Sequence, residues 1–276
     1  MGEFPFRVSL NASTLFPYEL DIRAQIRTAA EAGYEGIEIW MKDLQAYAQG
    51  GGSVAALRRE AADLGIEIAG AISFIPWADT DEDVRARGRR QTDEELTLLA
   101  ELGCPSFAAP PFGDVADATA EELAARYAAL AEQARGYGIV PILEFWGRAR
   151  RLSRLGEAIE VARLSGVEQV PLLLDPFHLY TGGSDLNDLS RLRKEDIGIV
   201  HANDYPSSPP RETITDADRL FPGDGIAPSA QLAAALAACG YRGFLSLELF
   251  APDYGGRTAL ETARHGLAKI KQAYAV

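Results

Sequence analysis

The 276-residue chain has little cysteine, little histidine and a deficit of positive charge. Two cysteines, Cys104 and Cys239, cannot build the dense disulfide framework of small secreted domains, so we expect two buried, reduced thiols. The 27 lysines and arginines are outnumbered by 40 aspartates and glutamates, which leaves a net charge of −13. A negatively charged surface repels phosphate backbones, and the charge balance therefore argues against a nucleic-acid partner.

Long apolar runs and targeting signals are also missing. No segment approaches the ~18 uninterrupted apolar residues of a transmembrane helix, so we expect no membrane span. The first residues, Met1–Pro5, lack the basic stretch and apolar run of a signal peptide, and we expect a cytoplasmic protein. No Gly-x-Gly-x-x-Gly motif follows the first predicted strand, and no other glycine-rich phosphate cradle is evident. A dinucleotide site and a phosphorylated substrate are both disfavoured.

What the chain does contain is an even alternation of short apolar runs and longer helical patterns. Helical spacing marks, among others, the segments Asp21–Ala32, Thr119–Tyr137, Ser229–Cys239 and Thr258–Tyr274. Eight runs rich in Ile, Val, Leu or Phe are typical of strands buried on both faces: Arg7–Leu10, Gly36–Trp40, Glu67–Ile72, Ser106–Ala109, Val140–Phe145, Val170–Leu174, Ile197–Val200 and Phe244–Leu249. This pattern predicts an α/β fold, a (β/α)8 TIM barrel forming a single domain over residues 1–276. A doubly wound open sheet is the alternative.

Four residues that could bind a metal stand at the ends of the last four predicted strands: Glu144, Asp175, His201 and Glu248. In a TIM barrel the C-terminal strand ends form the active-site face. Three carboxylates that converge on one barrel mouth are costly unless a cation neutralises them. An oxygen-rich set with one imidazole suits Mn²⁺, Mg²⁺, Co²⁺ or Zn²⁺, and we predict one such ion here.

Other side chains are expected at the same end of the barrel. His178 lies three residues after Asp175 and either points into the site or packs within its loop. The proline-rich segment Asn203–Pro228 is interpreted as an active-site cover. The run Arg148–Arg151 either forms a solvated loop, which we favour, or binds an anionic group of the substrate, and His265 is interpreted as a surface or packing residue. Aromatic residues that would stack on a sugar-like substrate or plug the barrel fall at or just after strands: Trp40, Phe74, Trp77, Phe112, Trp146, Phe177 and Phe250.

These motifs resemble those of the xylose-isomerase-like TIM-barrel superfamily of sugar isomerases and epimerases, and within it the inosose isomerases most. The segments that carry the resemblance are Leu143-Glu144-Phe145-x-Gly147, Leu174-Asp175-x-Phe177-His178, His201-x-x-Asp204, Asp218-Arg219-x-x-Pro222-Gly223-x-Gly225 and Leu247-Glu248-Leu249-Phe250. The resemblance implies that Glu144, Asp175, His201 and Glu248 hold one divalent metal, and that Glu144 and Glu248 are the acid/base pair. Substrate contacts would come from His178, Arg219, Trp146, Asn11 and Glu38.

The implied function is a manganese- or other divalent-metal-dependent isomerase or epimerase of a keto-sugar or keto-inositol, as in inositol catabolism. A metal that polarises a ketone acidifies the adjacent C–H, one carboxylate removes that proton, and Arg219 supports the resulting metal-bound enediolate. Reprotonation at the neighbouring carbon isomerises the substrate, reprotonation on the other face epimerises it, and loss of a β-leaving group dehydrates it. A dehydratase therefore stays open. The expected partner is this small molecule, and a homo-oligomer also stays open.

Two other classes are weighed against this reading. An abasic-site nuclease on the same barrel needs a histidine-rich multi-metal cluster and a basic surface, whereas this chain has three histidines and a charge of −13. A non-catalytic sugar-binding protein would be expected to have lost one of the carboxylates, and all of them are present.

Overall fold

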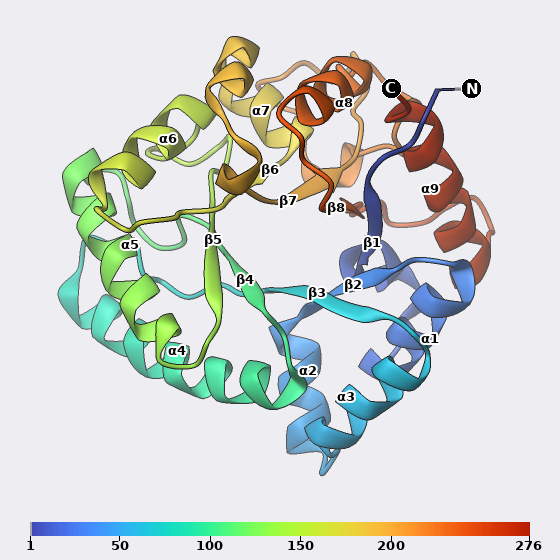
Figure 1. The fold of residues 1–276 in the computed structure, drawn as a ribbon, viewed down its shortest axis with the longest axis horizontal. Helices are drawn as coiled ribbons and strands as arrows, with labels where there is room; N and C mark the ends of the chain where they lie inside the picture. The colour runs from blue at the N-terminus through green and yellow to red at the C-terminus, as the bar shows by residue number, and fades with distance from the viewer. Residues whose placement is uncertain (1) are drawn as a thin grey trace.

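The computed structural model describes residues 2–276, and its eight parallel strands pair in chain order to close a barrel (Figure 1). The strands are β1 (Arg7–Asn11), β2 (Gly36–Trp40), β3 (Glu67–Ile72), β4 (Ser106–Ala109), β5 (Val140–Glu144), β6 (Leu172–Leu174), β7 (Ile197–Ala202) and β8 (Phe244–Leu247). The predicted (β/α)8 TIM barrel is confirmed, and the open sheet is excluded. The predicted sixth strand was too long at its start, where Pro171 has no N–H to donate to a ladder.

Helices surround the barrel on its outer side (Figure 1). They are α1 (Ile22–Ala32), α2 (Met41–Gln49), α3 (Val54–Asp63), α4 (Glu82–Leu102), α5 (Ala120–Arg135), α6 (Leu155–Leu164), α7 (Pro176–Gly182), α8 (Ser229–Ala238) and α9 (Ala259–Ala273), with short 3-10 turns at η1 (Ala12–Tyr18), η2 (Leu186–Arg191), η3 (Lys194–Asp196) and η4 (Asp216–Asp218). Thr119 and Thr258 begin α5 and α9 with capping boxes, in which the threonine and a glutamate three residues later satisfy each other's backbone N–H groups.

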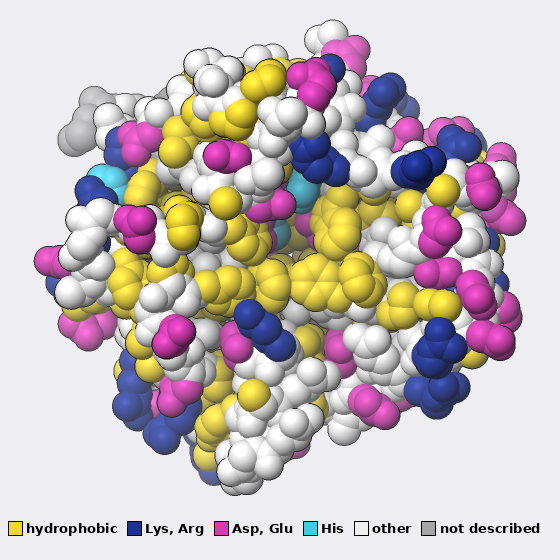
Figure 2. All heavy atoms as spheres, turned by 180° about the vertical axis from the view of Figure 1, so that it is seen from behind, with side chains coloured by type: hydrophobic (Ala, Val, Ile, Leu, Met, Phe, Trp, Pro, Cys, Tyr) yellow, Lys and Arg dark blue, Asp and Glu magenta, His cyan; other side chains and the backbone are white. Residues whose placement is uncertain are grey.

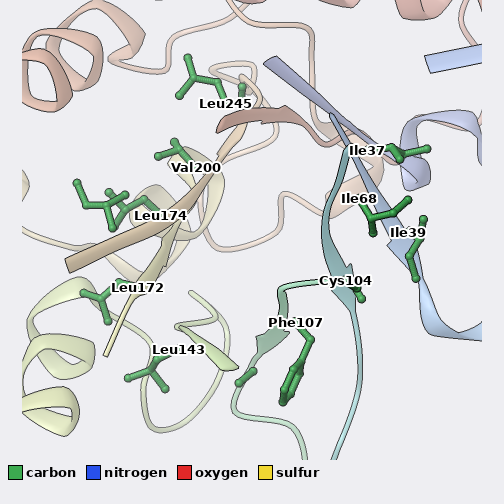
Figure 3. Packing of buried hydrophobic residues seen from close by; sticks show 14 of the residues in the cluster. Ile37, Ile39, Ile68, Cys104, Phe107, Leu143, Leu172, Leu174, Val200 and Leu245 are labelled. Carbon is green, nitrogen blue, oxygen red and sulfur yellow. The ribbon is translucent and has the colours of Figure 1, made fainter. Parts of the chain in front are cut away.

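Successive side chains of each strand point alternately toward the helices and into the barrel. The outward set, which includes Ile37, Phe107, Leu143, Leu174 and Val200, packs in the layer beneath the helices (Figure 3). A smaller inward set fills the barrel itself with Ala69, Ile72, Ala108, Ile142, Leu173 and Ile199. The interior of the barrel is therefore largely a packed apolar core.

The long segment after β7 is fastened at both ends by Asp204. The backbone of Asp204 pairs with Leu220 in an antiparallel bridge. Its buried carboxylate accepts hydrogen bonds from the N–H groups of Tyr205, Gly223 and Ala227. The predicted cover is thus a pinned loop, and its return path brings η4 and Arg219 back over the barrel mouth.

Two expectations about the chain's chemistry are settled by the fold. Both cysteines are free thiols, and Cys104 is buried as expected, whereas Cys239 is only partly buried, so the expectation of two buried thiols is wrong for Cys239. His265 is half-buried on α9 with its ring edge-to-face against Phe221, so it is a packing residue as predicted. Within residues 2–276, none of the helices combines the length and the apolar character that a membrane crossing requires.

Candidate active site

The mouth of the barrel opens into a cavity of about 770 Å³. Figure 2 views the molecule from behind Figure 1 and shows a hollow with hydrophobic side chains around it and acidic and histidine side chains inside. The lining includes six of the predicted site residues, namely Glu144, Trp146, His178, His201, Arg219 and Glu248. A cavity of this size is within the range of about 300–1,000 Å³ that small-molecule sites occupy.

The two carboxylate oxygens of Asp175 have different partners, one in the start of a helix and one in the site. It is the N-cap of α7, where Oδ1 accepts hydrogen bonds from the Phe177 N–H at 2.7 Å and from Asn203 Nδ2 at 3.0 Å. Oδ2 faces the cavity floor, 2.8 Å from Arg219 Nη1. Burial disfavours the charged form, but Arg219 with the two nearby histidines holds the pKa of Asp175 well below its usual range.

His201, on β7, lies between two carboxylates at the centre of the site. Its Nε2 is 3.1 Å from Glu38 Oε2, and its Nδ1 is 2.9 Å from Glu248 Oε2. Burial opposes a charge on the ring, yet Glu248 and Glu38 raise the pKa of His201 well above its usual value. Neither ring nitrogen makes a hydrogen bond of sound geometry with the described part of the chain. The buried His201 ring therefore lies against the carboxylates of Glu38 and Glu248 without a well-formed hydrogen bond to either.

Arg219 joins the carboxylates of two strands from the loop above them. Its Nη1 donates to Asp175 Oδ2 at 2.8 Å and to Glu248 Oε2 at 2.6 Å. Its Nη2 and Nε donate to Asp216 Oδ1. The guanidinium also lies over the rings of Phe177 and Phe250, at 4.6 and 5.2 Å from their centroids. Arg219 therefore makes an ion pair with Asp216 of its own loop and also contacts the carboxylates of the site.

Glu144 is the last residue of β5, and Arg219, which donates hydrogen bonds to Asp175 and Glu248, makes no such bond to it in the described structure. Its Oε1 is 3.8 Å from His178 Nε2. Burial raises the pKa of the Glu144 carboxyl to about 8, and the nearby Glu248 and Asp175 add to that effect. Burial also lowers the pKa of His178, so the imidazole beside Glu144 favours its neutral form. His178 does point into the site, which settles its orientation.

These residues fit a divalent cation. Single ligand atoms of Asp175, His201 and Glu248 all lie within 4.8 Å of one another, and all three residues are buried. The His201 ring nitrogens have no hydrogen-bond partner of sound geometry in the described part of the chain, and a cation would favour the charged form of Glu144, which burial otherwise disfavours. Glu38 beside His201 Nε2 resembles the carboxylate that commonly orients a metal-ligating histidine. Glu144 falls outside the 4.8 Å group, and its role as a fourth ligand stays a prediction.

Asn11 and Glu38 lie beneath the cavity rather than along its lining. Asn11 Nδ2 donates to Glu248 Oε1 at 3.1 Å, and its Oδ1 accepts from the Trp40 indole at 2.8 Å. Both side chains support the residues that do face the cavity. Their predicted contact with a substrate stays a prediction.

Two sequence-based expectations were wrong in part. Trp77 does not face the mouth, because its ring packs on Tyr127 and its indole N–H donates to the Pro110 carbonyl. The loop after β5 is not simply solvated, because Arg148 donates hydrogen bonds to the backbone carbonyls of Arg211, Glu212 and Ile214. Sequence reasoning also missed Asn203 as the partner of Asp175. Its place two residues after His201 was the available signal.

Comparisons with known proteins agree with this geometry. A family model described as "Xylose isomerase-like TIM barrel" matches residues 26–273. The inosose isomerase of Halalkalibacterium halodurans is 34% identical over 145 residues, which cover 51% of this chain and 51% of that protein. The 3-dehydroshikimate dehydratase of Pseudomonas aeruginosa is 30% identical over 256 residues, which cover 89% of this chain and 39% of that protein. The chain thus spans about half, or less, of the length of these relatives.

The solved structure of the IOLI protein with a binding zinc atom superposes with a TM-score of 0.88 over 98% of this chain and 99% of that one, at 24% identity. At this identity the likeness shows a shared barrel. The family model, by contrast, spans nearly the entire sequence. The chain therefore belongs to the xylose isomerase-like TIM barrel family.

Proposed function

We propose that this protein is a divalent-metal-dependent isomerase or epimerase of a keto-sugar or keto-inositol. The observation that carries the proposal is the buried cluster of Asp175, His201 and Glu248 at the floor of a small-molecule cavity, with Arg219 against it. Inosose isomerases are among the relatives of this chain, which supports a polyhydroxy ketone as the substrate.

Asp175, His201 and Glu248 would hold the ion, with Glu144 as the fourth proposed ligand. A bound divalent ion would supply Lewis-acid polarisation of the substrate carbonyl. Glu144 and Glu248 reach the cavity from strands that β6 and β7 separate, so they approach a bound ketone from different sides. One of them removes the proton beside the carbonyl, and one of them returns a proton to complete the reaction.

The remaining side chains position the reacting groups. Arg219 is always charged, and its planar fork can donate to a substrate oxygen that gains negative charge. Hydrogen bonds from Arg219 and Asn11 fix the orientation of the Glu248 carboxylate. His178 presents Nε2 toward the cavity beside Glu144, where it can hold a substrate hydroxyl.

A dehydratase is the second candidate, since a 3-dehydroshikimate dehydratase matches over 89% of this chain. Removal of the same proton followed by loss of a β-hydroxyl gives elimination in place of proton return. The residues required for the first half of the two reactions are identical, so the products distinguish them.

The test is a substrate panel followed by proton NMR in D₂O. Metal-free protein is loaded separately with Mn²⁺, Mg²⁺, Co²⁺ or Zn²⁺ and incubated with ketoses, inososes and 3-dehydroshikimate. Deuterium incorporation next to a carbonyl, with an isomeric or epimeric product, is the expected result. Elimination would favour the second candidate. Bound metal without exchange or turnover on any member would contradict the proposed function.

A further inference from the structure

The upper part of the cavity is walled by aromatic rings in mutual contact. Trp40 and Phe74 have ring centroids 5.5 Å apart, and Phe74 and Phe112 are again 5.5 Å apart. Trp146 lies 6.0 Å from Phe74 and 6.3 Å from Phe112, and Phe250 lies 6.0 Å from Trp40. All five residues line the cavity. They form one surface, the aromatic wall, from the floor to the rim.

The polar atoms of this wall face the floor. The indole N–H of Trp40 donates to Asn11 Oδ1 at 2.8 Å, and Trp146 hydrogen-bonds to Glu144. The other three members of the wall are phenylalanines. A ligand beside the wall therefore meets mainly carbon, although Asp114, Arg148, Arg150 and Asp216 also line the cavity. A polyol stacked on the rings would give up hydration of its hydroxyls without gaining hydrogen bonds from the rings in return.

Phe112 marks the outer limit of the wall. Its side chain is 38% exposed, so the aromatic wall continues to the solvent boundary. Exposed apolar surface at the rim of a binding cavity commonly belongs to the ligand-binding surface. The floor can take the ketone and its neighbouring hydroxyl, while most of the remaining lining offers apolar contact.

We infer that the substrate carries a flat aromatic group beyond its α-hydroxyketone, and that this group stacks on the aromatic wall formed by Trp40, Phe74, Phe112, Trp146 and Phe250. The inference rests on the proposed function, because it places the hydroxyketone end at the metal. An unsubstituted keto-sugar would occupy the floor and leave the wall uncovered, so the inference narrows the proposed substrate to a polyhydroxy ketone that bears an aromatic group. Aromatic rings prefer offset or edge-to-face contact with one another, and the wall offers several such positions.

The test compares two ligands with the same head group on Mn²⁺-loaded protein by isothermal titration calorimetry. Hydroxymethyl phenethyl ketone carries the ring, and hydroxymethyl ethyl ketone lacks it. The phenyl compound should bind about tenfold tighter or more. In Phe112→Ala the ratio of the two Kd values should fall toward one. Leu64→Ala, which removes a 43% exposed leucine outside the cavity lining, should keep the wild-type ratio.

The outcomes separate the two proposals. A ratio near one in the wild-type protein, or an unchanged ratio in Phe112→Ala, would overturn the aromatic subsite and leave the proposed function standing. D-fructose bound as tightly as the phenyl compound would do the same. Binding of Mn²⁺ with no binding of either hydroxyketone would contradict both.

Discussion

Glu144 and Glu248 face one cavity from different surroundings. Glu248 accepts hydrogen bonds from Arg219 and Asn11, whereas Glu144 lies 3.8 Å from the His178 imidazole and burial raises its pKa to about 8. Two carboxyl groups in such unlike environments are suited to different protonation states during one reaction. This asymmetry is the residue-scale basis for the proposed proton transfer.

Glu144→Gln and Glu248→Gln should each reduce turnover by about 10²–10⁴-fold. The amide keeps the shape of the side chain but cannot take up the substrate proton. Deuterium exchange into the substrate measures the loss, and circular dichroism melting checks that the fold persists. Near-normal exchange in both variants would mean that another group is the base.

Arg219→Ala should lower kcat/KM by an amount that corresponds to a loss of about 2–4 kcal/mol of transition-state stabilisation, since the guanidinium would no longer support developing negative charge on the substrate. Asp216→Ala is the matched variant, because Asp216 contacts Arg219 from the loop while Nη1 keeps its bonds to Asp175 and Glu248. Asp216→Ala should lower kcat/KM clearly less than Arg219→Ala does. Steady-state kinetics on both variants provide the comparison, and wild-type values for Arg219→Ala would remove the arginine from the mechanism.

At the scale of elements, helix α4 carries a buried glutamate, Glu95, that contacts the residue after β3. Glu95 is 3% exposed and accepts hydrogen bonds from Ser73 at 2.5 Å and from Gln91 at 2.8 Å. Ser73 directly follows β3 and precedes Phe74 of the aromatic wall. The hydrogen bond between Ser73 and Glu95 therefore connects the position of α4 to the backbone that carries Phe74 at the cavity.

Burial raises the pKa of Glu95, so the folded protein binds this proton more tightly than the unfolded chain does. Its contribution to stability is complete below the ordinary glutamate pKa and is lost as the pH rises through the raised value. Urea unfolding between about pH 5 and pH 8 should thus show Glu95→Gln gaining stability relative to the wild type as pH increases. A pH-independent difference between the two proteins would show that Glu95 does not titrate in this way.

At the scale of the whole molecule, metal binding should be linked to folding. The ligands come from β6, β7 and the end of β8, and they meet only when the barrel is closed. An ion that binds the folded state alone stabilises it by about 2.7 kcal/mol at a hundredfold excess over Kd. The site therefore predicts a metal-dependent Tm.

Asp175→Asn/His201→Gln should lose both the bound metal and the rise in Tm that Mn²⁺ causes. Asparagine can still cap α7, so the double variant should fold. His265→Gln, which alters a packing histidine on α9, is the control and should retain both properties. Metal content by mass spectrometry and melting by calorimetry give the two measurements. Unchanged metal content in the double variant would place the ion elsewhere.

The sequence by itself determined the order of the strands, and it located their ends to within about two residues. Buried parallel strands need apolar side chains on both faces, so a carboxylate such as Asp175 or an imidazole such as His201 stands out at the end of such a run. The metal-ligand candidates were accordingly visible from local pattern alone. The alternation of these apolar runs with helical segments was sufficient to predict the barrel.

Only the tertiary structure decided how these residues are partnered. Arg219 reaches Asp175 and Glu248 because Asp204 pins the intervening loop, and Glu38 meets His201 because closure of the barrel brings β2 across from β7. Trp77 points away from the mouth, and its indole N–H donates a hydrogen bond to the Pro110 carbonyl. Such contacts join segments far apart in the chain. Their energies depend on loop paths and strand register, which the pattern around any one residue does not encode.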